Sequence, residues 1–386
     1  MDVISTYYYI LAVIILLGSV MPLIIYLRYG MEPKINYSVN YEVDLPTDDP
    51  PAVINAICSG FSKKVGEPDM DGFIATIMDL IDRNYLLLVD MESEDVNSNS
   101  IFLRINPDYN PDTLRDFEET VIDFLREYEQ DGTISMDWIS ESLSYSDSAS
   151  FFKETYKNWK NEVKDDLWNN GNLKEAFLRK GDKYLKIFGI SGLISSVAVF
   201  FVIFLNSWAL ISDILLYSMM FVSPLLRVLL ITKNKDIHLA IYGIFGLMVV
   251  VTSLFKIFSG TLTAFEIVFL SSIVLGTASL ISIMLPEKIA GQWTTYGREY
   301  YAQWHSFKKY IEDYSLIKEY SPKSVNVWDK YLVYATALGI ADEVKKSMEM
   351  SIPNDRLRGS DLYSFQYYNS PTSLLKNAIK TALEPD

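Results

Sequence analysis

The sequence contains little of the side-chain chemistry from which cross-links and metal sites are built. Its 386 residues include one Cys and two His. A disulfide framework needs paired cysteines, and structural zinc sites need clustered Cys and His, so both are excluded. A phosphate-binding loop, a zincin helix and a nucleophile elbow are also absent. We therefore expect no cofactor, no metal and no enzymatic activity.

Charged residues are missing from long stretches of the chain. Tyr7 to Leu27 is an uncharged run of 21 residues, and 26 uncharged residues lie between Lys186 and Asp213. Residues 184–285 carry eight charged side chains in total. A helix that crosses a bilayer needs about 20 apolar residues. A wholly soluble protein and a disordered chain are therefore excluded, and a multi-pass α-helical membrane protein is predicted.

Hydropathy predicts five membrane spans, in contact with the lipid bilayer. The third is the weakest, because Asp213 and Arg227 interrupt it, and a short re-entrant pair is the alternative there. The spans are Tyr7 to Leu27, Ile187 to Trp208, Ala209 to Ile231, Ile237 to Phe258 and Leu262 to Leu285.

Basic residues set the orientation of these spans. Arg28 and Lys34 follow the first span, whereas no basic residue precedes it, and Lys233 and Lys235 lie between the third and fourth. Because Lys and Arg concentrate in cytoplasmic loops, the N-terminus is expected outside the plasma membrane and the C-terminus in the cytoplasm.

Charge divides the rest of the chain into blocks. Residues 31–183 carry 15 basic and 32 acidic side chains, whereas residues 286–386 carry 13 of each. The predicted order is a transmembrane anchor (1–30), an acidic cytoplasmic domain (31–183), a four-span bundle (184–285), a helical cytoplasmic domain (286–350) and a polar, loosely ordered tail (351–386).

The start of the acidic domain is typical of a winged-helix module, over residues 49–105. Pro50 and Pro51 open a short helix, and a second helix runs from Asp71 until Asn84 ends it. Two strands, 85–89 and 101–105, then form a hairpin. Further helices are expected within 110–169. Asn110 and Pro111 open the first, a Ser-rich loop follows it, and the next helix begins at Ser150.

A winged helix raises the question of nucleic-acid binding. Affinity for duplexes comes largely from Lys and Arg that neutralise phosphates, and the acidic domain has a net charge of −17. We therefore expect no nucleic-acid partner and interpret the module as one that docks proteins.

An amphipathic helix with aromatic residues follows the last span. Its apolar face is predicted to pack on protein, with a ligand-stacking platform as the alternative. This seam, the candidate interaction surface, contains Tyr300, Trp304, Phe307 and Ile311. A further helix from Ser324 should end at Gly339, where glycine suits a helix C-terminus.

Polar residues inside the predicted spans are the candidate functional residues of the bundle. Buried charges are costly and need partners, so a structural clasp is expected, with an ion path as the alternative. These residues are Asp213, Arg227, Lys256 and Glu266. Small residues at helical spacing, such as Gly192 and Ser196, favour close packing of the spans.

Three segments resemble elements of a known family. Residues 73–89 (FIATIMDLIDRNYLLLV) resemble the AT-x-x-DL-x-x-x-GYL element of the YciQ-like predicted membrane proteins, a domain of unknown function. Residues 297–310 (GREYYAQWHSFKKY) and 331–339 (YLVYATALG) are similar to the elements that follow the membrane spans in that family. This chain has Asn84, Ser306 and Val333 where the family usually has other residues. The resemblance implies a topology and a prokaryotic membrane location, and it implies no reaction.

These observations lead to one functional hypothesis and two alternatives. The chain is expected to be a docking or scaffolding component of a cell-envelope assembly that acts through its cytoplasmic domains on protein partners. A small-solute transporter or channel component is the alternative, and a membrane-bound enzyme ranks lowest.

The orientation can be tested with single cysteines and an impermeant thiol reagent on intact cells. Because Ser98 and Ser347 fall in cytoplasmic segments, Cys at either position should stay unlabelled, whereas Cys at Ser207 should react. Permeabilised cells supply the control. Labelling at Ser98 in intact cells would contradict the orientation.

Overall fold

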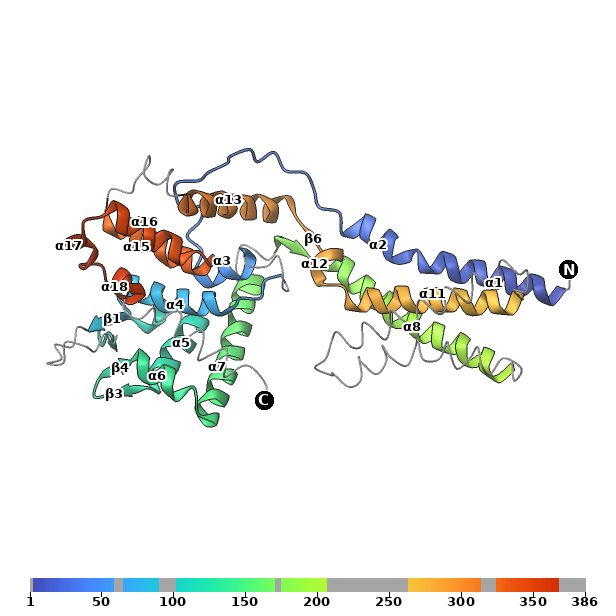
Figure 1. Cartoon of the computed structure of the whole chain (residues 1–386), viewed down its shortest axis with the longest axis horizontal. Coiled ribbons are helices and arrows are strands. Elements are labelled where there is room, and N and C mark those ends of the chain that lie inside the picture. Colours follow the sequence, from blue (N-terminus) through green and yellow to red (C-terminus); the bar gives the residue numbers. More distant parts are fainter. Residues whose placement is uncertain are drawn as a thin grey trace. The chain divides into compact units, whose positions relative to one another are not determined.

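The computed structural model describes residues 3–58, 65–89, 102–170, 175–206, 263–313 and 324–367 (Figure 1). These residues are mostly helical, with a small antiparallel sheet. They form two compact units, a helical unit (1–32 and 178–292) and a mixed unit (33–177 and 293–386). The C-terminal helices from Trp293 onward therefore share a unit with the acidic segment and do not form a compact body of their own.

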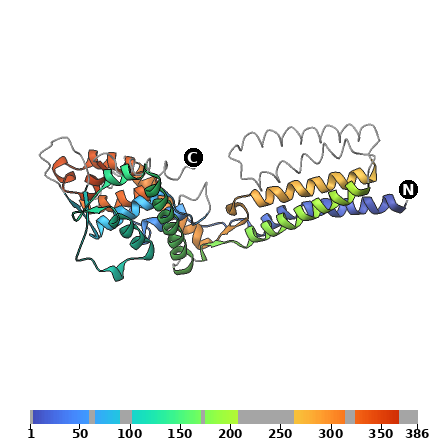
Figure 2. The ribbon, with the colours of Figure 1, turned by 90° about the horizontal axis from the view of Figure 1, so that it is seen from below.

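The helical unit is built on α11 (Ala264–Met284), with α1 (Val3–Ser19) and α8 (Lys180–Asn206) beside it (Figure 2). The short helices α2 (Met21–Tyr29) and α12 (Glu287–Ala290) pack near the start of α8. Large apolar side chains on α1 and α8 stay exposed, among them Leu17 at 66% and Ile194 at 64%. Such continuous apolar surface is typical of contact with lipid.

Two described stretches are long and apolar enough to cross a membrane, Ser5–Tyr29 and Ala264–Met284. They coincide with the first and fifth predicted spans. Helix α8 contains most of the second predicted span. The third and fourth predicted spans lie outside the described residues.

Small side chains allow α8 and α11 to approach closely, as predicted. The Ser196 hydroxyl donates a hydrogen bond to the Ser272 carbonyl at 2.7 Å. A Cβ atom at Gly192 would collide with the Ser279 hydroxyl. Close contact between small residues is the usual basis of helix association in a bilayer.

The mixed unit is organised around α4 (Met70–Asp82), whose side chains are buried on most faces. It packs against α3 (Pro51–Cys58), α5 (Asp116–Arg126) and α15 (Val325–Ala337). Asn84 ends the helix with a φ of 61°, and the Tyr85 amide donates to the Leu80 carbonyl at 2.8 Å. This left-handed position is favourable for glycine and tolerable for asparagine.

The predicted hairpin is present as β1 (Leu86–Val89) and β2 (Phe102–Ile105), with Leu86 opposite Ile105. The prediction of a Ser-rich loop after the helix that follows the hairpin is wrong. The chain there forms β3 (Glu129–Gln130), β4 (Thr133–Ser135) and α6 (Met136–Ser142). Asp131 and Gly132, with φ of 50° and 75°, make the tight turn that pairs β3 with β4. The sheet order is β1-β2-β4-β3.

Two helix starts differ from the prediction. Asn110 caps a short 3₁₀ helix, Pro111–Thr113, and α5 begins later at Asp116. The carboxylate of Glu118 accepts a hydrogen bond from the Arg115 amide at 3.0 Å. This capping interaction stabilises the N-terminus of α5. Helix α7 (Ser146–Asp165) begins before Ser150 and continues as a π-helical turn, Asp166–Asn170.

The C-terminal part of the mixed unit contains α13 (Thr295–Glu312), α15, α16 (Ala341–Ser351), α17 (Asn354–Leu357) and α18 (Asp361–Tyr367). The predicted cap is confirmed, because Gly339 follows α15 with a φ of 73°. The segment expected as a loosely ordered tail contains α17 and α18 instead. Among its described residues, Leu357, Leu362 and Phe365 are buried. Strands β5 (Phe177–Leu178) and β6 (Gln292–Trp293) lie where the chain passes between the units.

Candidate functional site

An extended segment, residues 33–50, lies over the C-terminal helices of the mixed unit without forming a helix or strand (Figure 1). We call it the strap. Side chains of α13 and α15 donate hydrogen bonds to its carbonyl oxygens: Arg298 to Pro33 at 2.7 Å, Ser306 to Val39 at 2.9 Å, Tyr331 to Val43 at 2.6 Å and Tyr334 to Asp49 at 3.0 Å. Carbonyl groups partly removed from water need such partners, so these side chains hold the strap in place.

The four seam residues on α13 are all buried within the mixed unit, and Trp304 is fully buried. The Trp304 ring lies 5.2 Å from that of Tyr334 and 5.6 Å from that of Phe307. Its indole N–H donates to the Thr47 hydroxyl of the strap at 3.3 Å. The seam therefore contacts the strap and α15, and its rings are occupied by protein neighbours.

Asp49 is the polar centre of this contact. The Tyr300 hydroxyl and the Thr47 hydroxyl both donate to the same Asp49 carboxylate oxygen, each at 2.8 Å. Burial and the Asp49 charge raise the pKa of Tyr300 far above its ordinary value. Tyr300 thus stays protonated as a hydrogen-bond donor.

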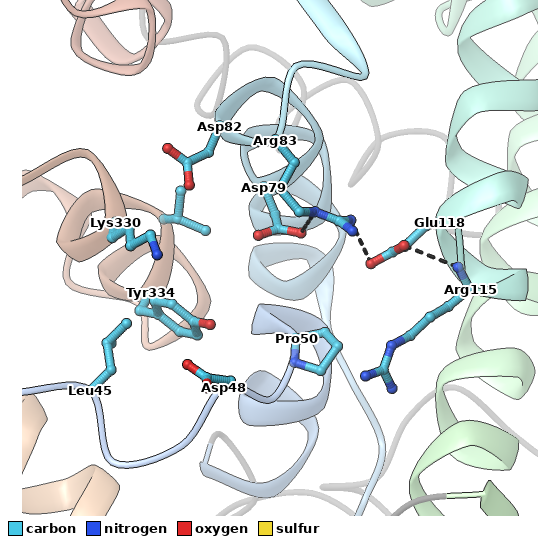
Figure 3. A pocket seen from close by; sticks show the side chains of 11 residues that line it. Leu45, Asp48, Pro50, Asp79, Asp82, Arg83, Arg115, Glu118, Lys330 and Tyr334 are labelled. Atoms are coloured by element: carbon cyan, nitrogen blue, oxygen red, sulfur yellow. Dashed lines mark hydrogen bonds and ion pairs between the residues drawn. The ribbon is translucent and has the colours of Figure 1, made fainter. Parts of the chain in front are cut away.

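A pocket of about 250 Å³ lies where the strap, the end of α4, the start of α5 and α15 meet (Figure 3). Acidic side chains enter from three of these elements, and basic ones from three. The acids are Asp48, Asp79, Asp82 and Glu118, and the bases are Arg83, Arg115 and Lys330. The Tyr334 ring forms part of the apolar wall.

Arg83 links two of these carboxylates. Its guanidinium lies 2.8 Å from Asp79 and 2.7 Å from Glu118. Arg115, on the other side of Glu118, pairs with Asp166 at 2.7 Å. One positive charge therefore serves two carboxylates, a partly buried one on α4 and a buried one on α5, and it ties the two helices together.

The pKa of Asp79 is raised to about 6, because burial disfavours the charged carboxylate more than Arg83 favours it. The nearby acids Glu118 and Asp82 add to the increase. The pKa of Asp82 is also raised, again chiefly by burial. Burial in the pocket therefore disfavours the charged forms of Asp79 and Asp82.

Three of the four candidate intramembrane residues, Asp213, Arg227 and Lys256, lie outside the described residues. The fourth, Glu266, is at the start of α11. Its carboxylate accepts hydrogen bonds from the Thr263 amide at 2.8 Å and from the Thr263 hydroxyl at 3.0 Å. This is a capping box, which gives Glu266 a structural role at the helix N-terminus.

The described residues contain no group of three His, Cys, Asp or Glu side chains arranged to hold a metal ion. Burial raises the pKa of the Cys58 thiol to about 12, which keeps it from acting as a thiolate. His305 stacks on Tyr301, and burial lowers its pKa.

Sequence reasoning missed the strap and the pocket. The strap has no periodicity, and its role depends on helices 265 to 288 residues further along the chain. The pairing of Asp79 with Arg83 was visible as an i,i+4 spacing on a helix. That Glu118 completes the network depends on how α4 and α5 pack.

Truncation of Trp304 tests the packing of the seam. Trp304→Ala should lower the stability of the detergent-purified protein by about 3 to 5 kcal/mol, since a fully buried aromatic is removed from a core. Thermal unfolding gives the comparison with wild type. Tyr296→Ala, an exposed tyrosine on the same helix, is the control and should change little. An unchanged transition for Trp304→Ala would contradict the packing.

The raised pKa of Asp79 predicts a pH-dependent stability. Between pH ~4 and ~6 the folded protein keeps a proton on Asp79 that the unfolded chain releases. The contribution of Asp79 to the free energy of unfolding therefore falls as pH rises. The free energy of unfolding of Asp79→Asn minus that of wild type should therefore be about 2 to 3 kcal/mol higher at pH 7 than at pH 4. Denaturant titrations followed by tryptophan fluorescence measure it. Asp112→Asn, at an exposed acid, is the control, and equal pH profiles for Asp79→Asn and wild type would refute the prediction.

Comparison with known proteins gives a family match over most of the chain. A family model described as the C-terminal domain of a predicted membrane protein (DUF2207) matches residues 38–348. This range includes all three segments that carried the resemblance, and the resemblance is confirmed. No curated protein and no solved structure matches the chain.

Proposed function

Because this chain belongs to the DUF2207 family of predicted membrane proteins, we propose that it is a membrane-anchored docking protein. In this proposal the helical unit holds the chain in the plasma membrane of a prokaryotic cell, and the mixed unit binds a protein partner on the cytoplasmic side. The proposal assigns no reaction, cofactor or metal to the chain.

The observation that carries the proposal is an exposed, purely acidic part of the mixed unit. Between Glu127 and Phe152 the chain has six acidic side chains and no basic one. Five of the six acids are exposed, from β3 through the start of α7. Large apolar side chains are exposed in the same stretch: Trp138 at 42%, Tyr145 at 60% and Phe151 at 42%.

Exposed aromatic residues among acids favour a partner of complementary composition. Aromatic side chains supply much of the binding energy in protein interfaces, and complementary charge speeds the encounter and selects the partner. The expected partner surface is therefore basic, with apolar residues that cover the three exposed rings. The same acidity disfavours nucleic acid, whose phosphates the surface would repel.

The finer predictions form part of this proposal. We retain five spans with the N-terminus outside and the C-terminus in the cytoplasm. We also interpret α3, α4 and the hairpin of β1 and β2 as a winged-helix-like module that supports the docking surface. The order of these elements supports this interpretation, and the acids Asp71, Asp79 and Asp82 on α4 favour a protein over a nucleic-acid partner.

Photo-crosslinking in native membranes tests the proposal. A photoreactive phenylalanine analogue at Tyr145 should capture a protein with a basic surface, and the yield should fall as salt rises because charge steers the encounter. The same analogue at Tyr296, exposed on α13, is the matched control. Absence of protein adducts at both Tyr145 and Trp138, in membranes where the chain is intact, would overturn the proposal.

A further inference from the structure

The pocket beside α4 has a charge imbalance that its own ion pairs do not remove. Arg83 is engaged by Asp79 and Glu118, and Arg115 by Asp166. Both guanidinium groups are therefore already matched by carboxylates, and one of them is shared between two. Neither is available as the main partner of a bound anion.

Two further carboxylates of the pocket, those of Asp48 and Asp82, form no such ion pair within the described residues. Within the described part of the chain, neither Asp48 nor Asp82 makes a hydrogen bond or an ion pair through its carboxylate. Lys330 and, more weakly, Arg83 act on Asp82 through space, and neither forms an ion pair with it among the described residues. Asp48 is on the strap and Asp82 is at the end of α4, so the two acids approach the cavity from different elements.

An aromatic ring lies near these carboxylates. In the view of Figure 3, the Tyr334 ring has Asp48 on one side and Lys330 and Asp82 on the other. Its hydroxyl donates to the Asp49 carbonyl at 3.0 Å, which fixes the orientation of the ring. A tyrosine face attracts a cation placed over it, and carboxylates at the rim would strengthen that attraction.

We propose that this pocket binds a guanidinium or primary ammonium group, with Asp48 and Asp82 as its charged partners and Tyr334 as its aromatic wall. The cavity of about 250 Å³ has room for such a group with a short aliphatic stem. A free amine and the basic side chain of a peptide share this chemistry. The proposal goes beyond the docking function, because the pocket and the acidic stretch 127–152 share no residue.

Isothermal titration of the full-length protein in detergent tests the site. Agmatine represents a free cation, and N-acetyl-arginine amide represents a side chain within a peptide. Either should bind, and N-acetyl-citrulline amide, of the same shape but uncharged, should not. Saturation by agmatine alone would assign a free amine, whereas tighter binding of the arginine amide would assign a peptide side chain.

Variants locate the binding. Asp48→Asn and Asp82→Asn should each raise the dissociation constant about fivefold. This is the effect of losing one ion pair at the upper end of the range of free energies for exposed ion pairs. Asp48 is exposed and makes no hydrogen bond through its carboxylate, so the first variant should fold as wild type does, with thermal unfolding as the check. Asp112→Asn makes the same change at an exposed acid outside the pocket and should bind as wild type.

Three outcomes would overturn the proposal. The first is no heat of binding for either cation at millimolar concentration. The second is equal affinity of wild type and both pocket variants. The third is binding of inorganic phosphate with loss of cation binding, which would assign the pocket to an anion. None of these results affects the crosslinking experiment at Tyr145, so the two proposals fail separately.

Discussion

Backbone carbonyl groups that leave water must find hydrogen-bond donors, and the strap meets this constraint without secondary structure of its own. Its donors are side chains on α13 and α15, which come from the far end of the chain. The buried seam of Trp304 and its neighbours then fills the space beneath. The mixed unit is one body because these two sequence-distant parts complete each other.

The same constraint recurs at Asn55, inside α3. Its side chain accepts from the Asp69 amide at 2.7 Å and donates to the Ala337 carbonyl at 2.9 Å. One buried amide therefore joins α3, the start of α4 and the end of α15. A Cβ atom at Gly72 would collide with this side chain, which explains why the third residue after the Asp69 cap of α4 is glycine.

Local features of the fold were predictable where a single segment contained its own signal. The end of α4 at Asn84, the β1–β2 hairpin and the glycine cap at Gly339 follow from turn and capping chemistry within a few residues. The Asp131–Gly132 turn contains such a signal too, although it lies beside a Ser-rich stretch that is typical of a loop. The pocket was not predictable, because Asp48, Asp82 and Tyr334 meet only through packing. Burial of Leu362 and Phe365 likewise depends on a core that their own polar segment does not reveal.

The discontinuity of the mixed unit has a consequence for how the protein is made. Residues 33–177 leave the ribosome first, and the helix α15 that completes their core ends near Leu338. At a synthesis rate of about 5 to 20 residues per second, the first part waits roughly ten to thirty seconds for the second. Helices α8 and α11 of the helical unit are made in that interval, while the apolar faces of α3 and α4 lack their C-terminal cover. The order of translation thus leaves apolar surface of the nascent mixed unit uncovered until its last helices are made.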